Sequence, residues 1–101
     1  MKRIAAAHLH ALRNTIEIQA VVARLEIPTS PRGRHVRFRC PRCHAHDAAA
    51  RAGESLARCF RCRRRFNPID LIMAEAGCGF PQAVAYLDLF FPHSNPTTGQ
   101  L

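Results

Sequence analysis

The chain has 101 residues, of which 48% are hydrophobic, and its formal net charge is +8 at pH 7. This length predicts a single domain. No apolar run approaches the roughly 18 residues that a membrane helix needs, so we expect neither a membrane span nor a membrane partner.

The first quarter of the chain is predicted to be helical. Residues 3–13 are rich in alanine and leucine, which favour helix. Residues 16–25 predict a second helix, for which Thr15 is a candidate N-cap. Its apolar residues recur at the spacing of one helical face: Ile18, Val21, Val22 and Leu25. Pro28 ends this helix, and residues 28–33 have the composition of a loop.

From His35 the hydrophobic pattern changes to a period of two, which predicts a strand. One face carries Val36, Phe38 and Cys40, and the other carries His35, Arg37 and Arg39. Residues 47–54 are expected to form an alanine-rich loop with Gly53 in a turn. Residues 55–61 then form a returning strand, which Arg63, Arg64 and Arg65 extend. One face of this returning strand carries Leu56, Arg58 and Phe60.

Four of the five cysteines form two C-x-x-C pairs that are fifteen residues apart: Cys40, Cys43, Cys59 and Cys62. This spacing is typical of a zinc site, because four thiolates bind Zn²⁺ as a closed tetrahedral shell. Two disulfides or four free thiols are the alternatives, but disulfides belong to secreted chains. Residues 1–30 show no signal-peptide pattern. We therefore expect one structural zinc ion and a reducing, cytoplasmic location.

Two further sets of residues near the pairs could bear on the metal. His44 or His46 could replace a cysteine as ligand, although four correctly spaced cysteines make this the weaker alternative. Cys78 lies outside the metal spacing and is expected to be a small, buried thiol near a helix end.

The C-terminal third is predicted to form two helices. Asn67 and Pro68 suit the N-cap and first position of a helix that ends at Gly77 or Gly79. Its apolar stripe consists of Ile69, Ile72 and Met73. Pro81 opens the next helix, whose apolar surface comes from Val84, Leu87 and Leu89. Phe90 and Phe91 are expected in the core, and residues 91–101 are expected to be a disordered tail.

These elements predict an α+β fold in which a small zinc ribbon of antiparallel strands is flanked by N- and C-terminal helices. The single domain spans residues 1–90, with helices in 1–27, the ribbon in 34–66 and helices in 67–90.

Positive charge is concentrated in the predicted ribbon. Eleven of the fifteen basic residues lie between Pro31 and Phe66, opposed only by Asp47 and Glu54. Such a patch indicates a polyanion partner, and arginine suits both phosphate and base stacking. A solvated, solubilising face is the alternative. The candidate nucleic-acid contacts are Arg34, Arg37, Arg39, Arg42, Arg58, Arg61, Arg63, Arg64 and Arg65.

The order of motifs resembles the N-terminal zinc-binding domain of bacterial and phage DNA primases. The likeness runs from about Ile16 to Leu87 and includes C-P-x-C, C-F-x-C, N-P-I-D-L-I-M and G-F-P-Q-A-V-A-Y-L. It places the four paired cysteines on the family's metal positions. Bacterial primases commonly have histidine where this chain has Cys43, which is closer to the phage pattern. The glycines expected after the second pair are replaced by Arg63, Arg64, Arg65 and Phe66.

The resemblance implies a free-standing module that binds single-stranded DNA template and assists primer synthesis by a separate primase, polymerase or helicase subunit. No paired acids suited to two-metal chemistry occur, so we expect no enzymatic activity from this chain alone. A zinc-stapled protein-interaction adaptor is the main alternative. A regulator that binds duplex DNA is a further one, although the basic residues fall on predicted strands and turns rather than on a helix.

Overall fold

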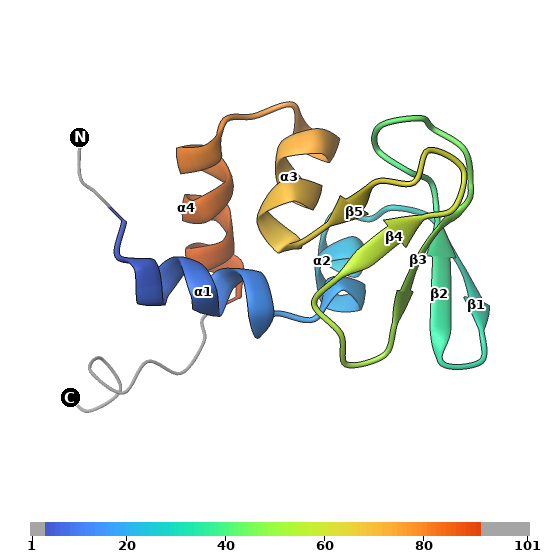
Figure 1. Ribbon diagram of the computed structural model, residues 1–101, viewed down its shortest axis with the longest axis horizontal. Coiled ribbons are helices and arrows are strands. Elements are labelled where there is room, and N and C mark those ends of the chain that lie inside the picture. The colour runs from blue at the N-terminus through green and yellow to red at the C-terminus, as the bar shows by residue number, and fades with distance from the viewer. Residues whose placement is uncertain (1–3, 92–101) are drawn as a thin grey trace.

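The computed structural model describes residues 4–91. Within this range the chain forms four helices and a five-stranded antiparallel sheet, which confirms the α+β class with helices at both ends (Figure 1). The predicted tail lies outside the described residues, apart from Phe91. The elements in chain order are α1 Ala6–Asn14, α2 Ile18–Arg24, β1 Thr29–Arg32, β2 His35–Phe38, β3 Ala48–Arg51, β4 Ala57–Cys59, β5 Arg65–Phe66, α3 Pro68–Ala76 and α4 Phe80–Phe90.

The sheet is a simple meander in which each strand pairs with the next one along the chain. Its inner face is apolar, because Phe38, Ala48 and Cys59 are successive cross-strand partners and all three are fully buried. The opposite face, called the outer face below, carries two rows of cross-strand neighbours. One row is Ser30, Arg37, Ala49, Arg58 and Arg65, and the next is Arg32, His35 and Arg51.

Helix α2 packs against the inner side of the sheet and is fixed there by hydrogen bonds. Its first backbone N–H, from Ile18, donates to the carbonyl of Glu54 at 2.9 Å. The Gln19 amide donates to the carbonyl of Ala50 at 3.0 Å, and the Glu17 carboxylate accepts from the N–H of Gly53 at 2.6 Å. The predicted face of α2 is confirmed, since Ile18, Val21 and Val22 are all buried.

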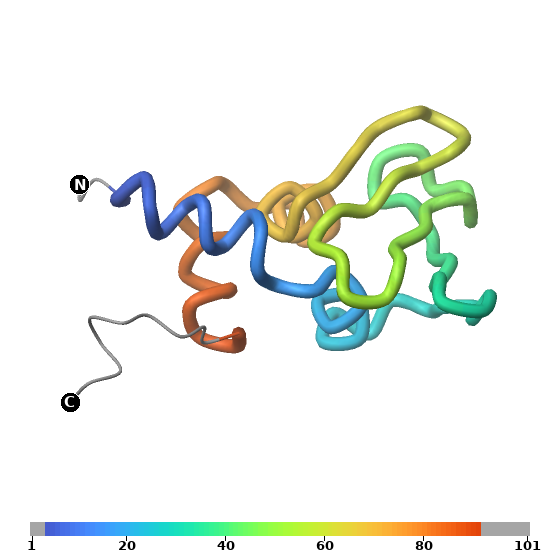
Figure 2. The backbone as a smooth tube through the Cα atoms, turned by 60° about the horizontal axis from the view of Figure 1, so that its bottom comes forward, coloured from blue at the N-terminus to red at the C-terminus, as the bar shows by residue number. Residues whose placement is uncertain are grey.

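The other three helices lie together at the end of the molecule away from β1 (Figures 1 and 2). Leu12 of α1, Ile69 of α3 and Leu87 of α4 are buried in the same core cluster as Phe38 of the sheet. A continuous core therefore connects the helices with the sheet and holds the sheet in place.

Helix α3 begins and ends as the sequence predicts. The Asn67 side chain accepts from the backbone N–H of Asp70 at 2.8 Å, and the Asp70 carboxylate accepts from the N–H of Asn67 at 3.4 Å. This reciprocal pair is a capping box. Gly77 terminates the helix with a left-handed φ of 67°.

Two segments predicted as loops are strands. Thr29–Arg32 forms the edge strand β1, where Pro31 is tolerated because an edge strand needs fewer ladder hydrogen bonds. Ala48–Arg51 forms the central strand β3, and its three alanines are buried. The sheet therefore begins at Thr29 rather than at residue 34. Gly53 does lie in the following turn, with a φ of 83°.

Three smaller predictions about individual residues were wrong. Thr15 does not cap α2; its hydroxyl donates to the Ala11 carbonyl at 2.6 Å, at the end of α1. Arg65 does not extend β4 but returns beside it in β5. Leu89 is 70% exposed, so it adds no apolar surface to the core.

The two phenylalanines at the end of α4 differ from each other. Phe91 packs against the core, as predicted, but Phe90 is exposed and its ring lies 3.8 Å below the guanidinium of Arg24. No helix within residues 4–91 is long and apolar enough to cross a membrane.

Candidate metal centre and basic surface

The two C-x-x-C pairs lie in turns of the same conformation. In the first, the N–H of His44 donates to the carbonyl of Cys40 at 2.9 Å; in the second, the N–H of Arg63 donates to the carbonyl of Cys59 at 2.9 Å. The residue after each second cysteine is left-handed, with φ of 67° at His44 and 66° at Arg63. Each turn therefore directs both of its sulfur atoms to the same side.

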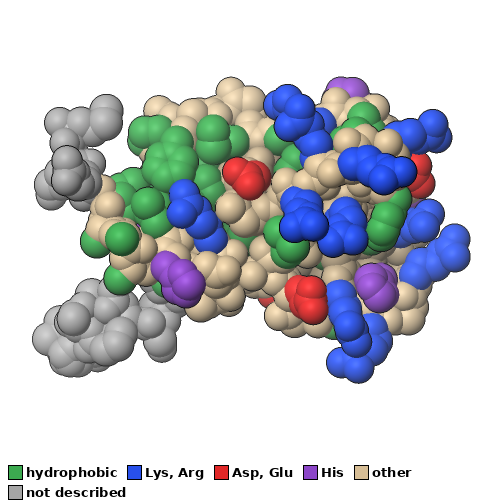
Figure 3. All heavy atoms as spheres, viewed as in Figure 1, with side chains coloured by type: hydrophobic (Ala, Val, Ile, Leu, Met, Phe, Trp, Pro, Cys, Tyr) green, Lys and Arg blue, Asp and Glu red, His purple; other side chains and the backbone are tan. Residues whose placement is uncertain are grey.

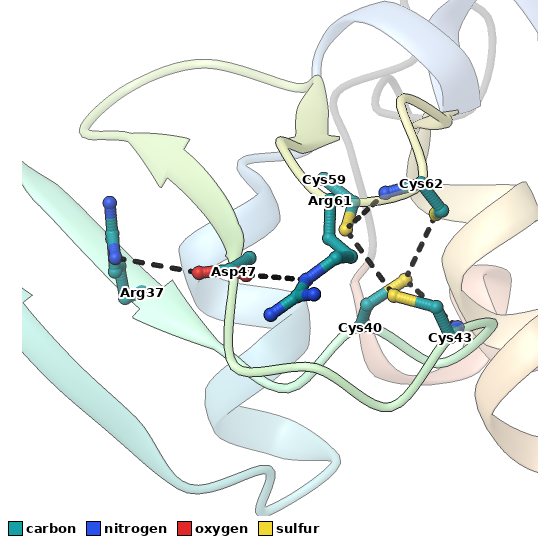
Figure 4. Close-up of polar contacts among 7 residues, drawn as sticks. All are labelled: Arg37, Cys40, Cys43, Asp47, Cys59, Arg61 and Cys62. Carbon is teal, nitrogen blue, oxygen red and sulfur yellow. Dashed lines mark hydrogen bonds and ion pairs between the residues drawn. The ribbon is translucent and has the colours of Figure 1, made fainter.

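The four cysteine sulfur atoms converge on one point between these turns (Figure 4). All four lie within 4.8 Å of one another and could hold a metal ion. Across the two pairs, the Cys40 and Cys62 sulfurs are 3.7 Å apart and the Cys43 and Cys59 sulfurs are 3.6 Å apart. The turns approach each other because Cys59 is paired with Ala48 in the sheet.

Neither histidine that follows the first pair belongs to this group. His44 is exposed, and the His46 ring nitrogen lies 3.2 Å from the hydroxyl of Ser30 instead. Cys78 is also separate, half-buried beside the end of α3, with its sulfur 3.9 Å from the Ile72 carbonyl. Among residues 4–91, the four predicted cysteines thus form the candidate site.

Backbone N–H groups point at two of the sulfur atoms. Those of Arg42 and Cys43 donate to the sulfur of Cys40, at 3.3 and 3.4 Å, and that of Cys62 donates to the sulfur of Cys59 at 3.5 Å. Such donors favour the thiolate form.

The two buried thiols differ in acidity without a metal. Burial raises the pKa of Cys40 to about 12, although the N–H donors oppose the rise. Burial also acts to raise the pKa of Cys59, but donation from the Cys62 and Arg61 backbone, with the Cys43 and Cys62 thiols, lowers it to about 7. A cation among the sulfurs would favour the thiolate at both positions.

Basic side chains gather over the half of the molecule that contains the sheet (Figure 3). Arg37, Arg58 and Arg65 belong to one cross-strand row of the outer face, as the alternation in the sequence predicts for Arg37. Within that row Ala49 is small and buried, so shallow depressions lie around it.

Three of the candidate arginines have acidic partners. Asp47 lies between two of them, 3.7 Å from Arg37 and 3.3 Å from Arg61 (Figure 4). Arg39 reaches Glu75 of α3 at 3.4 Å and so departs from the outer face. Exposed ion pairs of this kind contribute only about 0–1 kcal/mol to the stability of the fold. Replacing the carboxylate by a phosphate group would therefore lose little free energy.

The remaining candidates occupy three places. Arg63 lies beside Arg58 around the second cysteine turn. Arg34 is in the turn between β1 and β2. Arg42 and Arg64 line a hollow between the cysteine turns and α3. The structure thus divides the predicted patch into an outer-face group, a group beside α3, and Arg34 in the turn between β1 and β2.

Phe60 is a functional candidate that the sequence reasoning did not single out. The side chain is 58% exposed although it is a large aromatic. It lines the depressions on the outer face together with Arg37, Ala49 and Arg58. The available signal was its position one residue after Cys59, which puts it on the opposite face from that cysteine in the predicted strand of residues 55–61.

No protein-family model matches this sequence, and the comparison with curated proteins found no match either.

Proposed function

We propose that the four cysteines bind one zinc ion and that the outer face of the sheet binds single-stranded DNA. In this proposal the protein is a primase-type zinc module that assists a separate replication enzyme. The observation that carries the DNA part is the exposed Phe60 ring among the arginines of the outer face.

The sulfur geometry supports zinc as the metal. Four sulfurs at about 2.3 Å from a tetrahedral Zn²⁺ lie about 3.8 Å from one another. The distances of 3.6 and 3.7 Å between the two turns match this value. A disulfide would instead need about 2.05 Å. Soft thiolate ligands favour zinc over magnesium or calcium.

A fully thiolate shell assigns the metal a structural role. With four protein ligands, no open position remains for water or substrate. The ion would hold the two cysteine turns together, and these turns precede β3 and follow β4. Zinc would thereby fix the register of the strands that carry Arg37 and Arg58. Zinc content of one equivalent per chain in the purified protein, lost in a Cys43→Ser variant, is the test.

The outer face has the two components that single-stranded DNA binding needs. Arginines supply positive charge for the phosphates, and Arg58 and Arg65 have no ion-pair partner among residues 4–91. Phe60 supplies an exposed ring on which a base can stack, an interaction that accepts any base. Because bases in a duplex are already stacked, the combination favours a single strand.

The primase role itself comes from the sequence resemblance. It is supported by the metal positions and by the helix that follows the second cysteine turn, whose capping box sits at the Asn-Pro of the resembling motif. A partner primase, polymerase or helicase subunit would supply the chemistry in trans.

A protein-interaction adaptor is the second candidate, and one observation favours it. Leu89 and Phe90 at the end of α4 are 70% and 38% exposed. Stoichiometric co-purification of a protein, together with no retention on single-stranded DNA, would favour this alternative.

The test is binding of the zinc-loaded protein to single-stranded and duplex oligonucleotides across a salt series. Reversing charge at Arg37, Arg58 and Arg65 should abolish single-strand binding while zinc content stays at one equivalent. An Arg13→Glu variant changes charge on α1 instead and serves as the control. Equal affinity of the triple variant and the control would refute the outer-face assignment.

A further inference from the structure

Ser30 lies at the open edge of the basic outer face. It belongs to β1, which pairs with β2 on one side only and whose four residues are all exposed. Its cross-strand neighbour is Arg37, so Ser30 begins the row that continues through Ala49 to Arg58 and Arg65. Within this row Ser30 carries the one hydroxyl group. A group added to its oxygen would therefore lie on the face that carries the proposed DNA contacts.

A histidine contacts the Ser30 hydroxyl. The oxygen lies 3.2 Å from Nε2 of the exposed His46, in the connection between β2 and β3. A neutral ring nitrogen accepts the hydroxyl proton here, whereas a protonated ring donates to the oxygen. His46 forms no ion pair with any of the described residues 4–91. An anionic group on the Ser30 oxygen would therefore meet a ring nitrogen that can donate to it.

Arg37 is only weakly engaged by its acidic partner. Its guanidinium lies 3.7 Å from the Asp47 carboxylate, and the same carboxylate lies 3.3 Å from Arg61 (Figure 4). One carboxylate is thus shared by two partly exposed arginines, which leaves one positive charge without a counterion. A phosphoryl group on Ser30 would offer Arg37 three further acceptor oxygens. Asp47 would repel that group, but its charge is offset by Arg61.

We propose that Ser30 is a phosphorylation site whose phosphoryl group is held by Arg37 and His46. The Ser30 oxygen attacks the γ-phosphorus of ATP bound to a protein kinase. The bond from this phosphorus to the β–γ bridging oxygen breaks, ADP leaves, and the hydroxyl proton passes to a base of the kinase. Because β1 is exposed and open on one side, the kinase reaches the hydroxyl without unfolding the sheet.

The consequence is regulatory and rests on the proposed DNA binding. A phosphoserine carries a charge of about −1.5 to −2 at pH 7. It would offset up to two cations of the outer face and withdraw Arg37 from the DNA backbone. Loss of one charge-assisted contact, about 1.5–3 kcal/mol, should raise the Kd for single-stranded DNA about tenfold or more. The slope of log K against log salt should fall by about 1.0–1.4.

The first experiment contains no DNA. Phosphoserine is incorporated genetically at position 30 of the full-length, zinc-loaded protein, and its phosphorus-31 NMR signal is followed against pH. Contacts with Arg37 and His46 favour the dianion, so the second pKa of the phosphate should fall from about 6 to about 5.5 or lower. Separate Arg37→Ala and His46→Asn variants should each raise this pKa again.

Phosphoserine in place of Thr29 is the matched control. Position 29 is exposed on the same strand, but its side chain lies on the other face. A phosphate there should titrate near its ordinary pKa of about 6. If the phosphates at positions 29 and 30 titrate alike, or if neither variant changes the pKa at position 30, the assignment of Arg37 and His46 is wrong. Zinc content and circular dichroism show that each protein is folded.

Two further measurements address regulation and the modification itself. Phosphoserine at position 30 should weaken single-strand binding about tenfold or more, whereas phosphoserine at position 29 should change the Kd no more than about threefold. Equal losses at both positions would refute the specific role of Ser30. If the unmodified protein binds no DNA, the DNA proposal fails, while the phosphate titration still decides the phosphate site. Mass spectrometry of the protein isolated from the cells that produce it should find phosphate on Ser30. Phosphate on Thr29 alone, or on neither residue, would overturn the modification.

Discussion

Replacing Phe60 tests the proposal that the outer face binds single-stranded DNA. Its side chain is 58% exposed, and its backbone N–H bonds to the Asp47 carbonyl at 3.0 Å whatever the side chain is. A Phe60→Ala variant should therefore fold normally, with the free energy of unfolding changed by no more than about 0.5 kcal/mol. Stacking of one base on an aromatic ring contributes about 1–3 kcal/mol. The Kd for single-stranded DNA should consequently rise about 5- to 150-fold.

The salt dependence separates stacking from charge. Because Phe60 carries no charge, its removal should weaken binding equally at each salt concentration and leave the slope of log K against log salt unchanged. Removing a phosphate contact by Arg58→Ala should instead reduce the slope by about 0.7. Fluorescence anisotropy with a labelled oligothymidine measures both quantities. Phe60→Tyr keeps the ring and should remain within about threefold of the wild-type Kd.

Two outcomes would contradict the stacking argument. A Kd for Phe60→Ala within twofold of wild type would mean that the exposed ring does not contact a base. A changed salt slope in this variant would mean that the ring acts by positioning the neighbouring arginines, such as Arg58, rather than by stacking.

Other predictions concern the metal and the core. Metal binding should release protons and become weaker as pH falls, because burial raises the pKa of Cys40 to about 12 and the metal must displace the thiol proton. Calorimetry in buffers of different ionisation enthalpy measures the number of protons released. Metal binding without proton release at pH 7 would contradict thiolate ligation by Cys40. Cys43→Ser should lose stoichiometric zinc and the cooperative thermal transition, and retention of either would contradict a structural metal. Phe38→Ala should lower the free energy of unfolding by about 3–5 kcal/mol, since the side chain is fully buried, whereas Phe60→Ala serves as the exposed control. Asn67→Ala removes the N-cap of α3 and should lower the free energy of unfolding, measured by urea denaturation, by about 1 kcal/mol. An unchanged free energy of unfolding would show that Asp70 alone stabilises the start of the helix.

The parts of the fold that could be predicted are those with a strong local signal. Asn67 followed by Pro68 marks a helix start by its own chemistry, and the cap formed as expected. The spacing of the cysteines predicted one shared metal site, and the four sulfurs lie within reach of one ion. In both cases a short motif in the sequence predicted the geometry that the structure shows.

The strands that escaped prediction lack such a signal. Ala48, Ala49 and Ala50 show no alternation of polar and apolar residues, and alanine has a low strand propensity. Ala48 and Ala50 belong to the inner face, and their small side chains let α2 lie close enough for the Gln19 amide to donate to the Ala50 carbonyl. That requirement is tertiary, so no local pattern reveals it.

The sequence could not indicate that the predicted basic patch is divided between different surfaces of the fold. Arg58 and Arg64 are near neighbours in sequence, yet Arg58 lies on the outer face and Arg64 lines the hollow between the cysteine turns and α3. The reversal of direction between β4 and β5 separates them. Phe60 was overlooked as a contact because an aromatic residue in a predicted strand is usually buried, and its position after Cys59 was a weaker signal than its exposure in the fold.

The left-handed backbone at Arg63 has a consequence for how this turn could be engineered. An L-residue with a side chain pays roughly 1–2 kcal/mol to adopt a φ such as the 66° found here, whereas glycine does not. Arg63→Gly should thus make the protein more resistant to heat while removing one cation from beside Phe60. Under the proposed DNA binding, Arg63→Gly would raise the melting temperature and weaken the affinity for DNA at the same time.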